Sequence, residues 1–310
     1  MATVIVHKAG LLTTVQDRGR YGYQRYGMPV SGAMDVFSLE LANLLVGNDP
    51  GDACLEATIS GPDLEFTGAA WIAITGADMD PHLNSQGIPM DTAVDVKPGD
   101  KIGFRGLRSG CRAYISFVGG IALPPVMGSR STYLRAGIGG FQGRVLMPGD
   151  ELPLGEPSGK PRLKKIPEGL IPEYKHEQTI RIISGPEAHY FEIAGLRSFL
   201  STEYTVTAQS DRMGYRLTGE PIKHKEGMTN IISAGISLGT VQVPGDGQPI
   251  ILMTDRQTSG GYARIANVIT VDLTLLAQMR PGGRIQFKET TLDIAQQVSI
   301  SRQLALLDLH

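Results

Sequence analysis

The sequence predicts a mainly β protein with two barrel-like units and a few short helices, and three observations carry this prediction. Apolar runs of strand length, rich in Val, Ile and Thr, recur along the whole chain. The 39 glycines and 19 prolines fall mostly between these runs. Helical periodicity is rare, and many short strands separated by turn signals are typical of barrels rather than of a doubly wound sheet.

The candidate strands are short apolar segments bounded by turn-forming residues. They lie at residues 2–9, 69–77, 113–120, 179–185, 229–236, 249–255 and 267–273.

Three segments favour helices. Between residues 34 and 46 apolar side chains recur at steps of three and four, and Gly47 ends the pattern. A second helix is predicted over Pro186–Leu200, with the proline in its first turn. The tail from Thr291 could form a third helix.

A Pro-Gly pair precedes a predicted strand at three places, around Gly99, Gly149 and Gly282. Proline at the second position and glycine at the third are typical of a type II turn, because glycine adopts a positive φ at little cost. The repetition suggests that one β unit was used more than once along the chain.

A chain of 310 residues exceeds the usual length of one domain, so two domains are expected. The Pro-rich, basic stretch near the middle is the best candidate for a linker. We therefore predict a first unit at 1–156, a linker at 157–176, a second unit at 177–290 and a helical tail at 291–310.

Charge and composition exclude several classes of protein. The 29 basic and 31 acidic residues give a net charge of −2, which argues against nucleic acid or an anionic membrane as partner. No apolar run is long enough for a membrane span, and the N-terminus does not resemble a signal peptide. Two widely spaced cysteines, Cys54 and Cys111, are interpreted as reduced thiols of a cytoplasmic protein.

Several common catalytic motifs are absent from the sequence. It has no Walker-type phosphate loop, no GxSxG elbow and no cluster of its six histidines with metal-ligand spacing, so no metal site is predicted. It also lacks an Ala-Met-Lys-Met biotin carrier segment. Chemistry with ATP or biotin would therefore need another polypeptide for that part.

Two glycine-rich stretches concentrate polar side chains. Residues 16–35 contain Asp17 and Arg20, and they could form either part of a site or a salt-bridged loop that caps the next helix through Ser31. Residues 128–144 place Arg130 and two more arginines among small residues, which favours an anion-binding loop over an ordinary exposed one.

The stretch TDRQTSGGY, residues 254–262, follows a predicted buried strand and is the third candidate. Gln257 and Thr258 can bind neutral amide or carbonyl groups, and the two glycines could let the backbone approach a ligand. The alternative is a bulge with a buried hydrogen-bond network. The hairpin expected just upstream could bring Gln242 and Gln248 to the same rim.

Five motifs lie in order along the chain. They are TTVQDRGRYGYQRYGMPVSGAMD, ANLLVGN, GSRST, DRMGYRLTGE and GTVQVPGDGQPIILMTDRQTSGGY. Together they resemble the family of the 5-oxoprolinase C subunit, over about residues 5–290. This family also includes the kinase-inhibitor antagonist KipA, allophanate hydrolase subunit 2 and the second half of the carboxyltransferase domain of biotin-dependent urea carboxylase.

The resemblance implies two cyclophilin-like β-barrel domains. It also implies two partner subunits, one KipI-like (allophanate hydrolase subunit 1) and one LamB/YcsF-like, with which the family opens 5-oxoproline to glutamate using ATP. Two alternatives stay open: carboxyl transfer from a biotin carrier chain to urea, and a KipA-like regulatory role.

The family motifs also imply site residues in this sequence. Because an unstrained amide resists water, the lactam oxygen needs activation as a phosphate, which requires cations and fixed dipoles. We predict catalytic roles for Asp17, Arg20, Arg212 and Asp255, with the arginines on phosphate or carboxylate and the aspartates in metal or proton handling. We predict substrate-binding roles for Arg130, Ser131, Gln257, Thr258 and Tyr262.

Overall fold

The computed structural model describes residues 2–157, 161 and 163–309. Contacts between residues divide the chain into two compact units. Unit 1 comprises Met1–Tyr21, Ser31–Tyr174 and Ala305–His310, and unit 2 comprises Gly22–Val30 and Lys175–Leu304. The predicted linker includes positions 158–160 and 162, which lie outside the described residues, and the predicted domain boundaries stay a prediction.

Unit 1 contains eleven described strands, one α-helix and two 3-10 turns. The strands are β1 Thr3–Lys8, β2 Leu12–Gln16, β3 Cys54–Thr58, β4 Asp63–Phe66, β5 Ala70–Asp78, β6 Pro81–Leu83, β7 Gln86–Gly87, β8 Ala93–Val96, β9 Lys101–Phe104, β10 Ser109–Phe117 and β11 Glu151–Pro153. The helix is α1 Val36–Val46, and the turns are η2 Leu134–Ala136 and η3 Glu168–Leu170.

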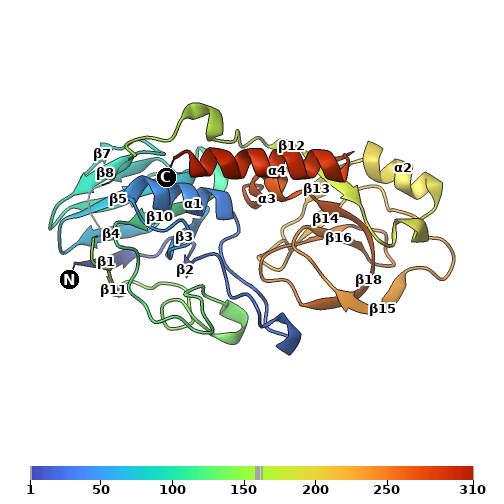
Figure 1. The fold of residues 1–310 in the computed structure, drawn as a ribbon, viewed down its shortest axis with the longest axis horizontal. Helices are drawn as coiled ribbons and strands as arrows, with labels where there is room; N and C mark the ends of the chain where they lie inside the picture. Colours follow the sequence, from blue (N-terminus) through green and yellow to red (C-terminus); the bar gives the residue numbers. More distant parts are fainter. Residues whose placement is uncertain (1, 158–160, 162, 310) are drawn as a thin grey trace. The chain divides into compact units, whose positions relative to one another are not determined.

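These strands form two sheets around one apolar core. Their orders are β11-β1-β4-β9-β6-β7 and β2-β3-β10-β5-β8. Alternate side chains of each sheet point inward, so Val4 and Leu64 from the first sheet share the core with Ile72 and Ile115 from the second. Helix α1 packs on β5 and β10 (Figure 1). The Asp35 carboxylate caps its first turn.

Unit 2 contains eight strands, three helices and three 3-10 turns among its described residues. The strands are β12 Glu177–Ser184, β13 Glu203–Val206, β14 Gly214–Thr218, β15 Asn230–Gly235, β16 Thr240–Val243, β17 Ile250–Leu252, β18 Ser259–Val268 and β19 Arg284–Glu289. The helices are α2 Ile193–Ser201, α3 Leu273–Ala277 and α4 Leu292–Leu307, whose last residues belong to unit 1. The 3-10 turns are η1 Gln24–Tyr26, η4 Ala188–Tyr190 and η5 Thr270–Asp272.

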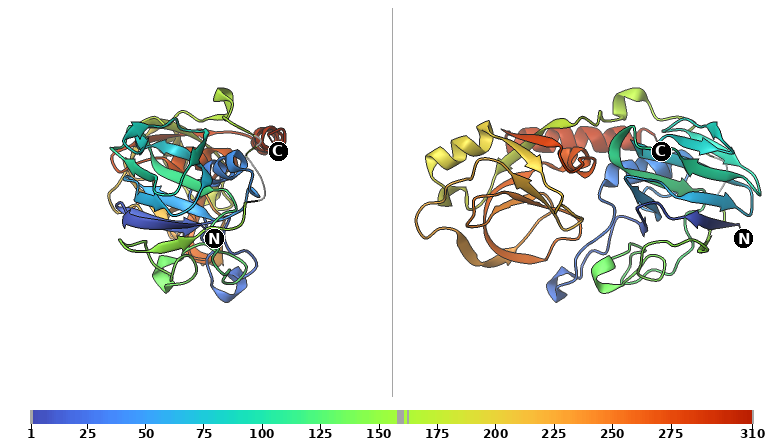
Figure 2. Two further views of the ribbon diagram at one scale, coloured as in Figure 1. Left: turned by 90° about the vertical axis from the view of Figure 1, so that its left-hand side faces the viewer. Right: turned by 180° about the vertical axis from the view of Figure 1, so that it is seen from behind.

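The strands of unit 2 close into a barrel, as Figures 1 and 2 show from opposite sides. The order runs β12-β19-β13-β14-β17-β16-β18, and β18 pairs back onto β12 from Ile182–Val268 to Ser184–Ala266. Strand β15 adds to β18 outside this ring. The prediction of a mainly β protein with barrel architecture and few short helices is confirmed.

The predicted type II turns are also confirmed. Gly99, Gly149 and Gly282 have φ values of 86°, 92° and 86°. Each turn is closed by a backbone hydrogen bond of 2.9–3.1 Å between its first and fourth residues.

Two local predictions are wrong. The second helix begins at Ile193 rather than Pro186, because the Glu187 carboxylate binds Arg264 of β18 and the next three residues form a 3-10 turn. The strand predicted at 267–273 ends at Val268, and Asp272 beyond it accepts hydrogen bonds from Arg181.

We expect Gly99→Ala to lower the free energy of unfolding by about 1 kcal/mol, because alanine is strained at positive φ. The matched control is Gly106→Ala, since Gly106 also has open space around it but lies outside the left-handed region. Denaturant titration measures the free energy of unfolding of both variants. Equal stability of the two variants would contradict the turn assignment.

Asp91 links the stability of unit 1 to pH. Burial raises the pKa of its carboxyl from 3.8 to about 6, since the ionised form is poorly solvated, and Asp78 adds to the effect. Its contribution to stability is therefore complete below pH 3.8 and is lost as the pH rises through about 6. The loss is about 3 kcal/mol.

We expect Asp91→Asn to raise the free energy of unfolding above pH 7 by about 1–3 kcal/mol and to flatten this pH dependence. Asp95→Asn, at an exposed position of β8, is the control. It should change neither the free energy of unfolding nor its pH dependence. Unfolding measured across the pH range checks both variants. An unchanged pH profile for Asp91→Asn would refute the assignment.

Candidate functional site

The Asp17 carboxylate lies where two distant segments of unit 1 meet. One oxygen, Oδ1, accepts hydrogen bonds from the Gly19 N–H at 2.7 Å, the Ser129 hydroxyl at 2.7 Å and the Ser131 hydroxyl. The other, Oδ2, accepts the Arg130 backbone N–H at 2.5 Å. The loop that was predicted to bind an anion through its N–H groups therefore binds a carboxylate of its own chain.

Arg20 is fully buried and donates to the backbone oxygen of Ser131, whose hydroxyl binds this carboxylate. The Arg130 side chain donates from Nε to the Leu123 oxygen at 2.6 Å. Thr132 bonds back to Val15 through its backbone N–H and its hydroxyl, each at 2.9 Å. The structure thus brings Asp17, Arg20, Arg130 and Ser131 together.

The remaining arginines of the 128–144 stretch do not join this cluster. Arg144 makes a bidentate pair with Asp150, at 2.7 and 2.8 Å, and Arg135 is exposed. Ser31 does not cap α1, because Asp35 does so; the Ser31 hydroxyl donates to the Thr132 oxygen at 3.1 Å instead.

Cys54 lies fully buried in the core of the same unit. Burial raises the pKa of its thiol well above the usual range, and Glu56 and Asp17 add to the rise. Both cysteines are free and buried, which confirms the expectation of reduced thiols.

In unit 2 the structure joins Arg212 to Asp255. Arg212 Nε lies 3.0 Å from Asp255 Oδ2, and Nη2 lies 3.3 Å from Oδ1. Both residues are buried, at 6 % and 5 % exposure, and the Asp255 N–H donates to the Arg212 oxygen at 2.8 Å. This two-pronged ion pair fixes the turn after β17 to the turn before β14.

Residues 256–258, which directly follow Asp255, line a cavity of about 510 Å³ within unit 2. Its lining residues are Gln24, Pro29, Val30, Gly235, Ile236, Ser237, Arg256, Gln257 and Thr258. The side chains of Gln257 and Thr258 make no hydrogen bond to the described part of the chain, so both can bind a ligand. Arg256 donates to the Ile236 and Met253 oxygens, each at 3.3 Å.

Other residues of the TDRQTSGGY stretch serve packing. A side-chain carbon at Gly260 would lie 2.5 Å from Ile236 and 2.9 Å from the Gln242 amide, so this glycine makes room for those side chains. Gln242 is buried, and Gln248 binds the backbone of Gly219. Tyr262 is 43 % exposed and lies outside the cavity lining.

Sequence reasoning missed several residues of this cavity, notably Gln24 and Ile236. Gln24 lies inside the first family motif, but nothing in the sequence indicated that its segment packs with unit 2 beside residues 256–258. Arg256 was also missed; it directly precedes Gln257 and could have been found from that spacing.

Two kinds of feature are absent from the described residues. Among them, no group of three or more His, Cys, Asp or Glu side chains could hold a metal ion. In the same part of the chain, no helix combines the length and hydrophobicity needed to cross a membrane.

Comparison with known families gives one match that spans most of the chain. The family described as "Carboxyltransferase domain, subdomain A and B" matches residues 26–289. This chain is 40 % identical over 288 residues to the 5-oxoprolinase C subunit of Escherichia coli, covering 93 % of this chain and 91 % of that protein.

Relatives of a second kind are much longer. The urea amidolyase of Saccharomyces cerevisiae is 35 % identical over 97 % of this chain, which corresponds to 17 % of that protein. The crystal structure of Kluyveromyces lactis urea carboxylase superposes with a TM-score of 0.94 at 31 % identity, covering 99 % of this chain and 29 % of that one. These matches confirm the resemblance inferred from the motifs.

We expect Asp255→Ala to destabilise unit 2 by about 3–5 kcal/mol, because it leaves the Arg212 charge buried without its carboxylate. The combined change Arg212→Met with Asp255→Leu should be more stable than either single change. Denaturant unfolding compares them with Glu168→Ala, which removes an exposed pair and should have little effect. Equal effects of Asp255→Ala and Glu168→Ala would contradict the buried pair.

Proposed function

The chain belongs to the family of carboxyltransferase domains with subdomains A and B, and on that premise we propose that it is the C subunit of a 5-oxoprolinase. The observation that carries this proposal is the 40 % identity to the Escherichia coli protein over nearly the full length of both chains. Urea amidolyase corresponds to this chain over only 17 % of its own length. The higher identity and the coverage of 91 % of the Escherichia coli protein favour the 5-oxoprolinase function over that of urea amidolyase.

The cavity of unit 2 offers groups suited to a lactam. A lactam has one N–H donor and one carbonyl acceptor, and the Gln257 amide can meet both while the Thr258 hydroxyl adds a second partner. Apolar contact from Ile236, Pro29 and Val30 suits the ring methylenes. We therefore assign the ring of 5-oxoproline to this cavity.

Hydrolysis of an unstrained lactam needs activation, and the proposal assigns this to ATP as a co-substrate of the assembled complex. Transfer of a phosphoryl group from ATP to the ring oxygen releases ADP and makes the carbonyl carbon more electrophilic. Water adds to this carbon, and the C–N bond breaks as the nitrogen takes up a proton. A second water then hydrolyses the resulting acyl phosphate to give L-glutamate and phosphate. The sequence has no Walker-type loop, so the KipI-like and LamB/YcsF-like partners are proposed to contribute the nucleotide site. The assembly is proposed to be cytoplasmic.

The predicted catalytic residues act in this proposal mainly by positioning. The Asp17 carboxylate forms hydrogen bonds with the Ser131 hydroxyl and with backbone N–H groups. Arg212 and Asp255 form an internal ion pair. Their direct roles on phosphate, metal or protons stay predictions. Asp255 sets the turn that presents Gln257 and Thr258, so its loss would disturb the substrate groups through the backbone.

Carboxyl transfer is the second candidate function, and one observation favours it. The whole chain superposes on Kluyveromyces lactis urea carboxylase with a TM-score of 0.94. Urea is also a small amide, so the same glutamine and hydroxyl groups could bind it. For this function, biotin is proposed to be held by a carrier segment outside this sequence, which contains no Ala-Met-Lys-Met motif.

The test is to co-express the chain with its KipI-like and LamB/YcsF-like partners and to measure ATP-dependent release of L-glutamate from 5-oxoproline. We expect activity only from the complete complex. Gln257→Ala should lower kcat/KM by about tenfold to a hundredfold through loss of one or two hydrogen bonds, with unfolding unchanged. Gln86→Ala, an exposed glutamine in unit 1, is the matched control and should retain full activity.

A complete complex that opens no 5-oxoproline but carboxylates urea from carboxybiotin would replace the first function by the second. Full activity of Gln257→Ala in the complex would instead exclude this cavity as the substrate site and leave the family assignment standing.

A further inference from the structure

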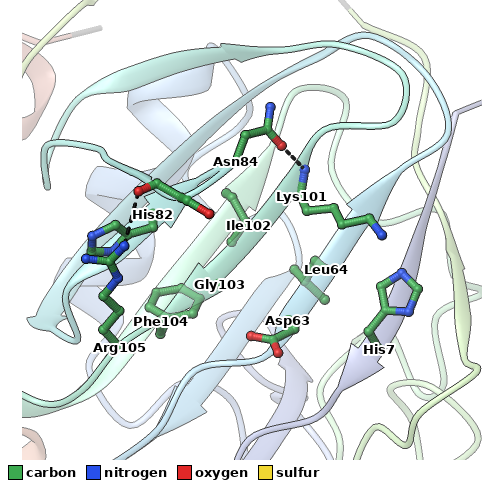
Figure 3. Close-up of a pocket in the computed structure, with 11 residues that line it drawn as sticks. His7, Asp63, Leu64, His82, Asn84, Lys101, Ile102, Gly103, Phe104 and Arg105 are labelled. Atoms are coloured by element: carbon green, nitrogen blue, oxygen red, sulfur yellow. Dashed lines mark hydrogen bonds between the residues drawn. The ribbon is translucent and has the colours of Figure 1, made fainter.

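A second cavity lies on the solvent-facing side of the six-stranded sheet of unit 1. It measures about 580 Å³ and crosses β1, β4, β9 and β6, as Figure 3 shows. Its lining residues are His7, Asp63, Leu64, His82, Asn84, Ser85, Lys101, Ile102, Gly103, Phe104 and Arg105. None of them belongs to the motifs discussed above.

Gly103 forms the floor of this cavity. It pairs across the sheet with His82 of β6, and its neighbour Ile102 pairs with Leu64 of β4, so Asp63 and His82 lie on either side of it. A side-chain carbon at position 103 would lie 3.0 Å from Asp63 Oδ1. The glycine therefore keeps open the space over which this carboxylate oxygen projects.

The two carboxylate oxygens of Asp63 have different surroundings. Oδ2 lies 3.1 Å from the ammonium group of Lys8, which is 78 % exposed. Oδ1 accepts no hydrogen bond from the described residues and faces the open floor. His82 adds a second acceptor: its Nδ1 lies 2.8 Å from the Asp80 backbone oxygen, which can only accept, so Nε2 of the neutral ring carries a lone pair.

Cationic side chains stand on both sides of this acceptor pair. Figure 3 shows Lys101 and Arg105 on either side of Gly103, with the Lys101 side chain directed toward His7 and the Arg105 side chain toward His82. Arg105 is exposed and donates only from Nη2, to the Ser85 oxygen at 3.2 Å, which leaves most of its five donors for a ligand. Lys101 pairs with Glu65 at 3.1 Å, but an exposed pair of this kind is weak and exchanges readily with another anion.

We propose that this cavity binds a small acidic α-amino acid. Its ammonium group would bind Asp63 Oδ1 above Gly103, and its two carboxylates would bind Arg105 and Lys101. The arrangement needs all three ligand charges, because the cavity presents an anionic centre between two cationic sides. Three side chains of mixed sign distinguish this site from a general anion patch.

The inference rests on the geometry of unit 1 and not on the proposed function. L-Glutamate, the product of the proposed reaction, belongs to the ligand class, so the site would let the protein respond to product at a place separate from the cavity of unit 2. Binding to the chain without substrate or ATP tests the site whatever the reaction proves to be.

The experiment is isothermal titration calorimetry of the full chain with L-glutamate. We expect saturable binding that weakens about tenfold in Asp63→Asn and in Arg105→Gln, the effect of losing one charge-assisted contact, and that is abolished by Gly103→Val. Arg216→Gln, which changes an exposed arginine of unit 2, is the matched control and should bind as the unchanged chain does.

Two ligand analogues separate the predicted contacts. Glutarate lacks the ammonium group and 4-aminobutyrate lacks the α-carboxylate, so both should bind at least about tenfold more weakly than L-glutamate. Equal affinity for glutarate would overturn the role of Asp63. Absence of binding at millimolar L-glutamate, or binding that none of the three substitutions weakens, would overturn the proposal.

Discussion

In unit 1, the polar stretch that begins at residue 16 is held to the loop around Ser131 by one buried carboxylate, that of Asp17. Asp17 collects four hydrogen-bond donors, two of them backbone N–H groups, from segments separated by more than one hundred residues in sequence. Burial of an ionised group is tolerated only when such donors replace its water. The glycines and small hydroxyl residues around it let the backbone come close enough to donate.

In unit 2 a buried carboxylate is again bound by donors of its own chain, here those of an arginine. Asp255 is neutralised by the Arg212 guanidinium and joined to the Arg212 backbone, which anchors the turn that follows β17. Directly after this anchor, the polar side chains of Gln257 and Thr258 line the cavity. The charged residues of the motifs therefore hold the backbone, and neutral residues next to them are the ones a small amide can reach.

Sequence reasoning succeeded where a feature depends on neighbouring residues and failed where it depends on distant ones. The turn at Gly99 was predictable because proline and glycine alone determine its conformation. The role of Gly260 was not, since it is decided by Ile236 and Gln242 from other strands. Likewise Asp17 was identified as a site residue from its motif, but nothing in the sequence indicated that its partners lie in the loop around Ser131.

The most direct test of the internally held carboxylate is amide hydrogen exchange at Gly19 and Arg130, the two backbone groups that donate to Asp17. If the carboxylate is held internally, both amides will be strongly protected in the unchanged chain and will lose that protection in Asp17→Ala, which removes both acceptor oxygens. Rapid exchange of both amides in the unchanged chain would contradict this arrangement, and Asp17 would then be available for chemistry instead.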